Sequence, residues 1–174
     1  MRDVIASIEQ EYRRYRKMGL AVLEQLGDDQ LCHKVSPESN SIATIVWHVA
    51  GNLASRFTDF LTTDGEKPWR QREDEFAERT ASREELVGKW KAGFAVVLGE
   101  LGALSDAELQ EVITIRGVEH SVSEALHRSL AHTSYHVGQM TYLGKMLAGS
   151  DWDYLTIPPG GTAEYNRNPT YEKG

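Results

Sequence analysis

The amino-acid sequence predicts an all-α protein built as a four-helix bundle. Four segments carry apolar residues at the three-to-four-residue spacing of amphipathic helices. A long polar connection separates the second segment from the third, and a short β-branched stretch precedes the fourth. Because the connection is long and a hairpin is inserted, we do not expect an up-down-up-down bundle with short loops.

The first two helices are predicted over residues 4–26 and 42–61. Residues 27–29, Gly-Asp-Asp, end the first helix, and Ser41 is placed to cap the second. Each helix has an apolar stripe that should face the core. The stripes consist of Val4, Ile8, Tyr12, Tyr15, Val22 and Leu26 in the first helix, and of Ile42, Ile45, Val46, Val49, Leu53, Phe57 and Phe60 in the second.

Residues 62–81 are predicted to form a long connection, since they are mostly polar. Trp69 and Phe76 are the large apolar residues of this stretch, and we expect them to pack against the bundle. Residues 82–85, Ser-Arg-Glu-Glu, have the pattern of a capping box and should open the third helix. The apolar face of that helix consists of Leu86, Trp90, Phe94, Val97 and Leu101.

A small β-hairpin is predicted before the fourth helix. Residues 112–115 and 118–120 form the two strands, and Arg116-Gly117 is the turn between them. Residues 121–124, Ser-Val-Ser-Glu, then cap the fourth helix. The core-facing stripe of that helix consists of Val122, Ala125, Ser129, His132, His136, Met140, Leu143 and Leu147.

Residues 150–174 are predicted to form an extended tail on the bundle. Trp152, Leu155 and Ile157 are the apolar side chains expected to hold this tail in place. With 174 residues, the chain is expected to form one domain, residues 1–174.

The composition excludes several classes of partner. A net charge of −7 and a pI near 5.4 argue against nucleic-acid binding, which needs a basic surface. No apolar run approaches the roughly 20 residues of a membrane span, so no membrane partner is expected. The N-terminal residues lack the zones of a secretory signal, and we therefore expect a cytoplasmic protein.

Two histidines, His132 and His136, lie on the core-facing stripe of the fourth predicted helix. Four residues of helix rise about 6 Å and turn slightly past one revolution, so both imidazoles are within reach of one metal ion. A buried imidazole without a partner costs about 1 to 3 kcal/mol, which metal binding would offset. His127, on the opposite side of the helix, is expected in solvent. The spacing by itself leaves a purely structural role open.

His48 lies in the second predicted helix and borders its apolar stripe. If both helices face one core, three neutral imidazoles could meet there, although a hydrogen-bonded core histidine explains His48 equally well. Asn52 and Gln139 are candidates for orienting the ligands, with ordinary capping or solvent contact as the alternative. His33 and His120 fall in connections and receive no role. No residue is assigned a direct catalytic role.

A metal at this place would have to use nitrogen and oxygen ligands. The single cysteine, Cys32, excludes an internal disulfide and a site with several thiolates. Three neutral imidazoles suit Zn²⁺, Ni²⁺ or Fe²⁺. No aspartate or glutamate is predicted at a core-facing position near His48, His132 or His136. We therefore expect a centre with open coordination positions, as in catalytic sites, rather than a closed structural one.

The residues around these histidines resemble the DinB/YfiT-like family. The segments that carry the resemblance are Ile-Val-Trp-His-Val-Ala-Gly-Asn at residues 45–52 and His-Thr-Ser-Tyr-His-Val-Gly-Gln-Met at residues 132–140. Residues 56–70 and 155–161 are similar to one uncharacterised bacterial subfamily, and the similarity runs over the whole chain.

This resemblance implies an up-down-down-up four-helix bundle, frequently a homodimer, with one divalent metal held by His48, His132 and His136. Zn or Ni is the expected ion, and Fe is the alternative. Relatives include S-transferases and isomerases that use low-molecular-weight thiols such as bacillithiol or mycothiol. The resemblance thus identifies the metal site better than the reaction.

Our leading hypothesis is a metal-dependent enzyme that acts on a small molecule and transfers a low-molecular-weight thiol to an electrophile. A metal-dependent hydrolase would use the same ion, since a bound divalent metal activates water as well as thiols. A non-catalytic, metal-binding or stress-related dimeric bundle is the alternative outside enzymes. A relative that binds no metal is the third possibility.

Overall fold

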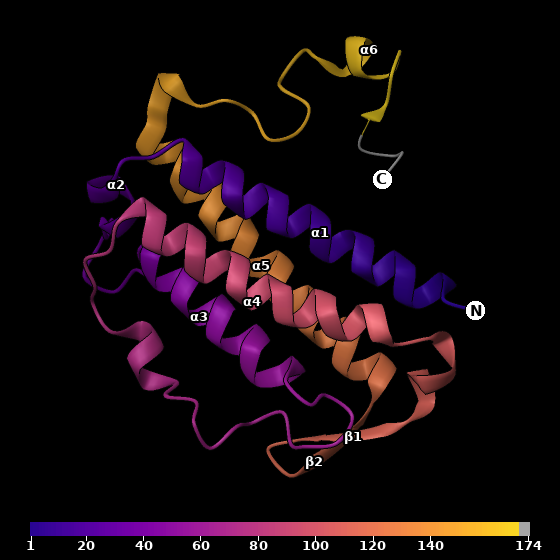
Figure 1. Ribbon diagram of the computed structural model, residues 1–174. Coiled ribbons are helices and arrows are strands. Elements are labelled where there is room, and N and C mark those ends of the chain that lie inside the picture. The colour runs from indigo at the N-terminus through magenta and orange to yellow at the C-terminus, as the bar shows by residue number, and fades with distance from the viewer. Residues whose placement is uncertain (171–174) are drawn as a thin grey trace.

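Four long helices form a bundle: α1 (Asp3–Glu24), α3 (Ile42–Phe57), α4 (Arg83–Ala103) and α5 (Val122–Ala148) (Figure 1). The computed structural model describes residues 1–170. Helices α1 and α5 run in one direction and α3 and α4 in the other, which is the up-down-down-up order. Both α1 and α3 pack against α4 and α5. The predicted all-α four-helix bundle is confirmed.

Hydrogen bonds at both ends fix the antiparallel packing of α1 and α4. Arg83 Nε donates to the carbonyl of Leu26 at 2.9 Å, just beyond the end of α1. Asp106 Oδ1 accepts the amide hydrogen of Ile5 at 3.0 Å, near the start of α1. Because α3 and α4 run parallel, the chain between them has to return along the length of the bundle. The predicted long connection makes this crossing and contains the 3₁₀ helix η1 (Glu73–Phe76).

Three of the long helices begin where the sequence predicts. The hydroxyl groups of Ser41, Ser82 and Ser121 accept the amide hydrogens three residues later, at 3.1, 3.2 and 3.1 Å. Glu124 also reaches back to the amide of Ser121 at 2.8 Å and completes a capping box. These bonds satisfy amides that the first helical turn leaves without partners.

Helix α3 ends at Phe57, four residues before the predicted boundary at residue 61. Asp59 adopts a φ of 49°, a left-handed conformation that a right-handed helix does not contain. Phe60 lies beyond the helix but is still buried, with its ring 5.0 Å from that of Phe57. Because Phe60 is buried without being helical, the spacing of apolar residues extends past the end of the helix, and the boundary was predicted too late.

Four short elements complete the helical structure: α2 (Asp28–Cys32), η2 (Asp106–Gln110), η3 (Gly149–Asp151) and α6 (Thr162–Tyr165). η2 begins with a capping box formed by Ser105 and Glu108. The other three lie in stretches predicted as links or tail. They have only three to five residues, too few to show a helical period.

The core is built around the predicted apolar face of α4, all of whose residues are buried. Trp90 is fully buried and donates from Nε1 to the carbonyl of Arg16 at 3.0 Å, which satisfies its polar atom. Gly93 permits close packing of α4 on α3, because a Cβ at this position would lie 2.7 Å from Ala50 Cα.

The predicted hairpin is also confirmed. Strands β1 (Val112–Ile115) and β2 (Val118–Ser121) pair antiparallel around a two-residue turn with positive φ at Arg116 and Gly117. Asp64, from the crossing connection, accepts both turn amides, each at 2.8 Å. The connection is thereby fastened to the hairpin.

The tail agrees with the prediction in part. Trp152 is 7% exposed and fills the space above Gly144, and Leu155 packs on the core, whereas Ile157 is 37% exposed. Residues 171–174 of the predicted tail and domain lie outside the described residues. In the part of the chain that the structure describes, no helix is both long and apolar enough for a membrane crossing.

The expectation that Trp69 packs against the bundle is wrong, since 54% of its surface is exposed. The next residue, Arg70, turns inward instead and its side chain is only 2% exposed. Phe76 does pack inward, with its ring 4.6 Å from the ring of His48.

Candidate metal centre

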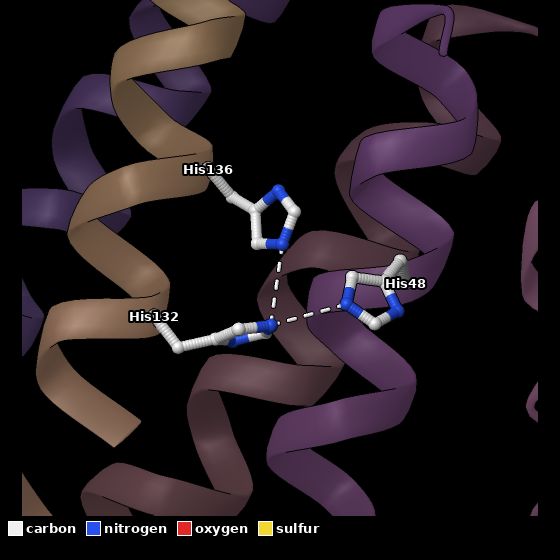
Figure 2. A group of neighbouring side chains, drawn as sticks. All are labelled: His48, His132 and His136. Carbon is white, nitrogen blue, oxygen red and sulfur yellow. Dashed lines mark hydrogen bonds between the residues drawn. The ribbon is translucent and has the colours of Figure 1, made fainter. Parts of the chain in front are cut away.

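Helices α3 and α5 bring the three predicted histidines together (Figure 2). His132 Nε2 lies 3.1 Å from His48 Nε2 and 3.2 Å from His136 Nε2. The ligand atoms of all three lie within 4.8 Å of one another. His48 and His136 are 5% and 8% exposed, so the cluster is largely shielded from water.

Hydrogen bonds on the far side of two rings determine which nitrogens carry protons. His48 Nδ1 lies 2.9 Å from Glu75 Oε2, and His136 Nδ1 lies 2.8 Å from Gln139 Oε1. Both oxygens are acceptors, so each Nδ1 is the donor and carries the hydrogen. In a neutral imidazole the other nitrogen then has a free lone pair. The Nε2 lone pairs of His48 and His136 therefore face the cluster.

This arrangement fits a divalent metal ion. A hydrogen on Nε2 of His132 can be donated to Nε2 of His48 or to Nε2 of His136, but not to both at once. Without a metal, one of these two lone pairs therefore has no hydrogen-bond partner. Metal–nitrogen bonds of 2.0–2.1 Å at tetrahedral angles put two ligand atoms about 3.3 Å apart, close to the 3.1 and 3.2 Å found here.

The protonation equilibria also favour metal binding. Burial, and then the neighbouring His136 and His48, lower the pKa of His132 to about 4. Burial also lowers the pKa of His136, although its hydrogen bond with Gln139 acts in the opposite direction. Both rings are therefore neutral at pH 7, the form that can bind a metal.

A buried carboxylate lies beside the cluster, contrary to the expectation that none would. Glu75 is 6% exposed and pairs with Arg70 through two hydrogen bonds, Nε to Oε1 at 2.8 Å and Nη2 to Oε2 at 2.9 Å. Burial raises the pKa of Glu75, but the bonds from His48 and Arg70 outweigh this and the net shift is downward. Glu75 is therefore ionised.

Glu75 faces Nδ1 of His48 and not the converging Nε2 atoms, so it orients a histidine and does not close the site. A carboxylate in this position fixes the ring and makes the opposite nitrogen a better ligand. The prediction failed because Glu75 belongs to η1 in the irregular connection, where no periodic pattern reveals which side chains point inward.

The histidine cluster opens into a cleft of about 360 Å³, which His48 and His132 line. The cleft is bounded by α3, the crossing connection, the hairpin and the first half of α5. Asn52 and His120 also line it, so His120 lies nearer to the centre than its place in a connection predicts. A small molecule could thus reach His48 and His132 from this side.

The other candidate residues lie away from the centre or orient it. His127 is exposed and bonds the carbonyl of Ser123 at 2.8 Å, as expected for the outer face of α5. His33 is exposed as well. Gln139 orients His136, one of the two roles considered for it.

Comparisons with known proteins agree with this fold. A family model described as "Protein of unknown function (DUF1572)" matches residues 1–161, and no curated protein matches the chain. A crystal structure of a DinB-like protein from Bacillus cereus ATCC 10987 is similar, with a TM-score of 0.68 and 18% sequence identity over 88% of this chain and 99% of that one. At this identity the likeness concerns the fold alone. This chain belongs to the DUF1572 family and has a DinB-like fold.

Proposed function

We propose that this protein is a metal-dependent enzyme that acts on small molecules and binds one divalent transition-metal ion through His48, His132 and His136. The convergence of the three Nε2 atoms, with Nδ1 of two rings already bonded to Glu75 and Gln139, supports this proposal. No carboxylate or thiolate of the described residues joins the Nε2 cluster. Three histidine ligands with free positions are typical of catalytic rather than structural metal sites.

When bound, a divalent ion supplies Lewis acidity, which lowers the pKa of a thiol or of water toward neutrality and provides a nucleophile at pH 7. The chain's own residues hold the ligands in position. Glu75 keeps the proton of His48 on Nδ1, and the buried Arg70 keeps Glu75 ionised. Gln139 does the same for His136 without adding charge.

Within this class, we propose the transfer of a low-molecular-weight thiol to a small electrophile. The sulfur donates an electron pair to an electrophilic carbon, the leaving group departs with its bonding pair, and the thiol proton passes to solvent. The sequence resemblance to thiol-dependent relatives supports this reaction. Hydrolysis, in which water replaces the thiol, is the alternative. The homodimer, the choice of Zn or Ni, and the cytoplasmic location stay predictions.

Metal analysis of protein purified without a histidine tag tests the site. We expect about one first-row transition-metal ion per chain, and the same stoichiometry when metal-free protein is titrated with Zn²⁺ or Ni²⁺. A folded, metal-free protein that takes up neither ion would contradict the proposal.

A conjugation assay tests the reaction. The metal-loaded protein is mixed with a low-molecular-weight thiol and monobromobimane, and the fluorescent thioether is measured against a metal-free control. We expect metal-dependent conjugation that His132→Ala abolishes and His127→Ala leaves unchanged. Ester hydrolysis in the absence of thiol, with no conjugation, would instead favour the hydrolase. Loaded protein that is inactive in both assays would favour the non-catalytic bundle.

A further inference from the structure

The cleft beside the histidines concentrates positive charge in a protein whose net charge is −7. Five arginines line the cleft, and within the described residues no aspartate or glutamate does. The arginines are Arg56, Arg70, Arg72, Arg116 and Arg128. Three carboxylates form ion pairs with them from outside the lining, namely Glu66, Glu73 and Glu75. Five positive charges against three negative ones leave a surplus of two.

Two of these arginines have structural partners. Arg70 is buried and bonds both oxygens of Glu75. Arg56 is 14% exposed at its side chain and donates to the carbonyl of Gly65 and to Glu66. The charges of Arg56 and Arg70 are thus used to hold the crossing connection in place.

The remaining three arginines are available to a ligand. Arg116 and Arg72 have side chains that are 56% and 43% exposed, and each forms one surface ion pair. Arg128 lies on α5 one turn before His132, and both residues line the cleft. Within the described residues, no ion pair or hydrogen bond engages the side chain of Arg128.

The cleft is small and one part of its wall is apolar. Phe57, Phe60, Ile115, Val118 and Ala125 contribute to its lining. Its volume of about 360 Å³ lies at the lower end of the range of small-molecule sites. A metabolite with an apolar body and a charged end fits these dimensions, and a macromolecule does not.

We propose that this cleft binds a small organic anion, a carboxylate or a phosphate ester, with Arg128 as the anchor for the charged group. Arg72 and Arg116 add charge around it. A guanidinium group presents paired donors that match the oxygens of carboxylates and phosphates. The helical spacing then directs the rest of the molecule toward His132 and His48. This inference rests on the proposed function in one respect, namely that the bound anion reacts at a metal held by the histidines; binding of the anion itself does not depend on it.

Titration of the full-length protein with benzoate, phenyl phosphate and the neutral analogue benzamide tests this proposal. Binding is measured by calorimetry on the metal-free and the metal-loaded protein, because a carboxylate can also bind a metal directly. We expect at least one of the anions to bind about tenfold more tightly than benzamide in both forms. Whichever anion binds more tightly distinguishes a carboxylate substrate from a phosphate ester.

Two arginine variants test the anchor. Arg128→Gln should weaken binding of the preferred anion about tenfold, and Arg128→Lys should weaken it less, since lysine keeps the charge but loses the paired donors. Arg14→Gln on α1, outside the cleft, makes the same charge change and should have no more than about a twofold effect.

Equal binding of anions and benzamide, or equal effects of Arg128→Gln and Arg14→Gln, would overturn the inference. Metal content measured on the same samples separates the two proposals. If one ion binds per chain but no anion does, only the anion site is wrong; if anions bind through Arg128 but no ion does, only the metal centre is wrong.

Discussion

Replacing Glu75 by glutamine removes one charge beside His48 and keeps the size of the side chain. Oε2 of Glu75 accepts hydrogens from His48 and Arg70, and Oε1 accepts a second hydrogen from Arg70. A glutamine keeps its bond to His48 only with its oxygen in the position of Oε2. Its NH₂ group then faces the Nε hydrogen of Arg70, so one bond is lost. His48 keeps an acceptor, but a neutral one.

The expected loss of metal affinity follows from this geometry. The carboxylate and His48 are 2.9 Å apart, and both side chains are 7% exposed, so solvent screens their interaction weakly. A hydrogen bond to a charged group in such a place contributes about 1.5 to 3 kcal/mol. Removing the partner of a metal-binding histidine typically costs 10- to 100-fold in affinity, or about 1.4 to 2.7 kcal/mol. We therefore expect Glu75→Gln to weaken metal binding by about one to two orders of magnitude.

Competition of the protein with a chromophoric chelator for Zn²⁺ measures this effect. Glu73→Gln is the matched control, since it makes the same charge change two residues away at a side chain that is 89% exposed. Its affinity should stay within about twofold of the original. Urea unfolding of the metal-free variant shows whether the protein still folds without the buried ion pair. If folded Glu75→Gln binds Zn²⁺ as tightly as the original protein, Glu75 does not support a metal-binding His48.

Three further predictions concern the metal ligands, pH and packing. His136→Ala should abolish stoichiometric metal binding and His127→Ala should not, as calorimetry would show; equal effects would contradict the placement of the centre on one face of α5. The pKa of His132 in the metal-free protein is about 4, below the 6.5 of an exposed histidine, so the unfolded chain binds the proton first as pH falls. Protonation of His132 should therefore lower the free energy of unfolding by about 3 kcal/mol between pH 6.5 and 4. Urea unfolding over this pH range should show that His132→Ala lacks this contribution. Gly93→Ala would place a Cβ 2.7 Å from the backbone of α3 and should destabilise the protein by about 1 to 3 kcal/mol in thermal unfolding. Gly99→Ala, with open space around it, should instead stabilise α4 by about 0.5 to 1 kcal/mol. A loss of similar size at both positions would contradict the assignment of the Gly93 effect to packing against α3.

Much of the fold follows from local patterns. The serine caps at Ser41, Ser82 and Ser121 and the turn at Arg116-Gly117 form as expected, because each depends on residues within a few positions. The end of α3 differs because Phe60 is buried through a turn, and apolar spacing does not separate that case from another helical turn.

The site was predictable only in its helical part. His132 and His136 share a face of one helix, and His48 lies on a second amphipathic helix, so periodicity carries information about all three. Arg70 and Glu75 lie in an irregular connection, where inward and outward side chains follow no period. The position of Glu75 depends on tertiary contacts, above all its bond with His48 and the fastening of Asp64 to the hairpin turn.

The three histidines and Glu75, which bonds His48, lie in different kinds of structure. The histidines are set in two rigid helices, whereas Glu75 and Arg70 reach them from a segment held at the hairpin by Asp64. Changes of sequence or length in that segment can therefore alter the electron-donating strength of His48 while the four helices stay the same. Among proteins of this architecture, differences in the surroundings of the position of His48 should accordingly appear first in the α3–α4 crossing, and only later at the histidines themselves.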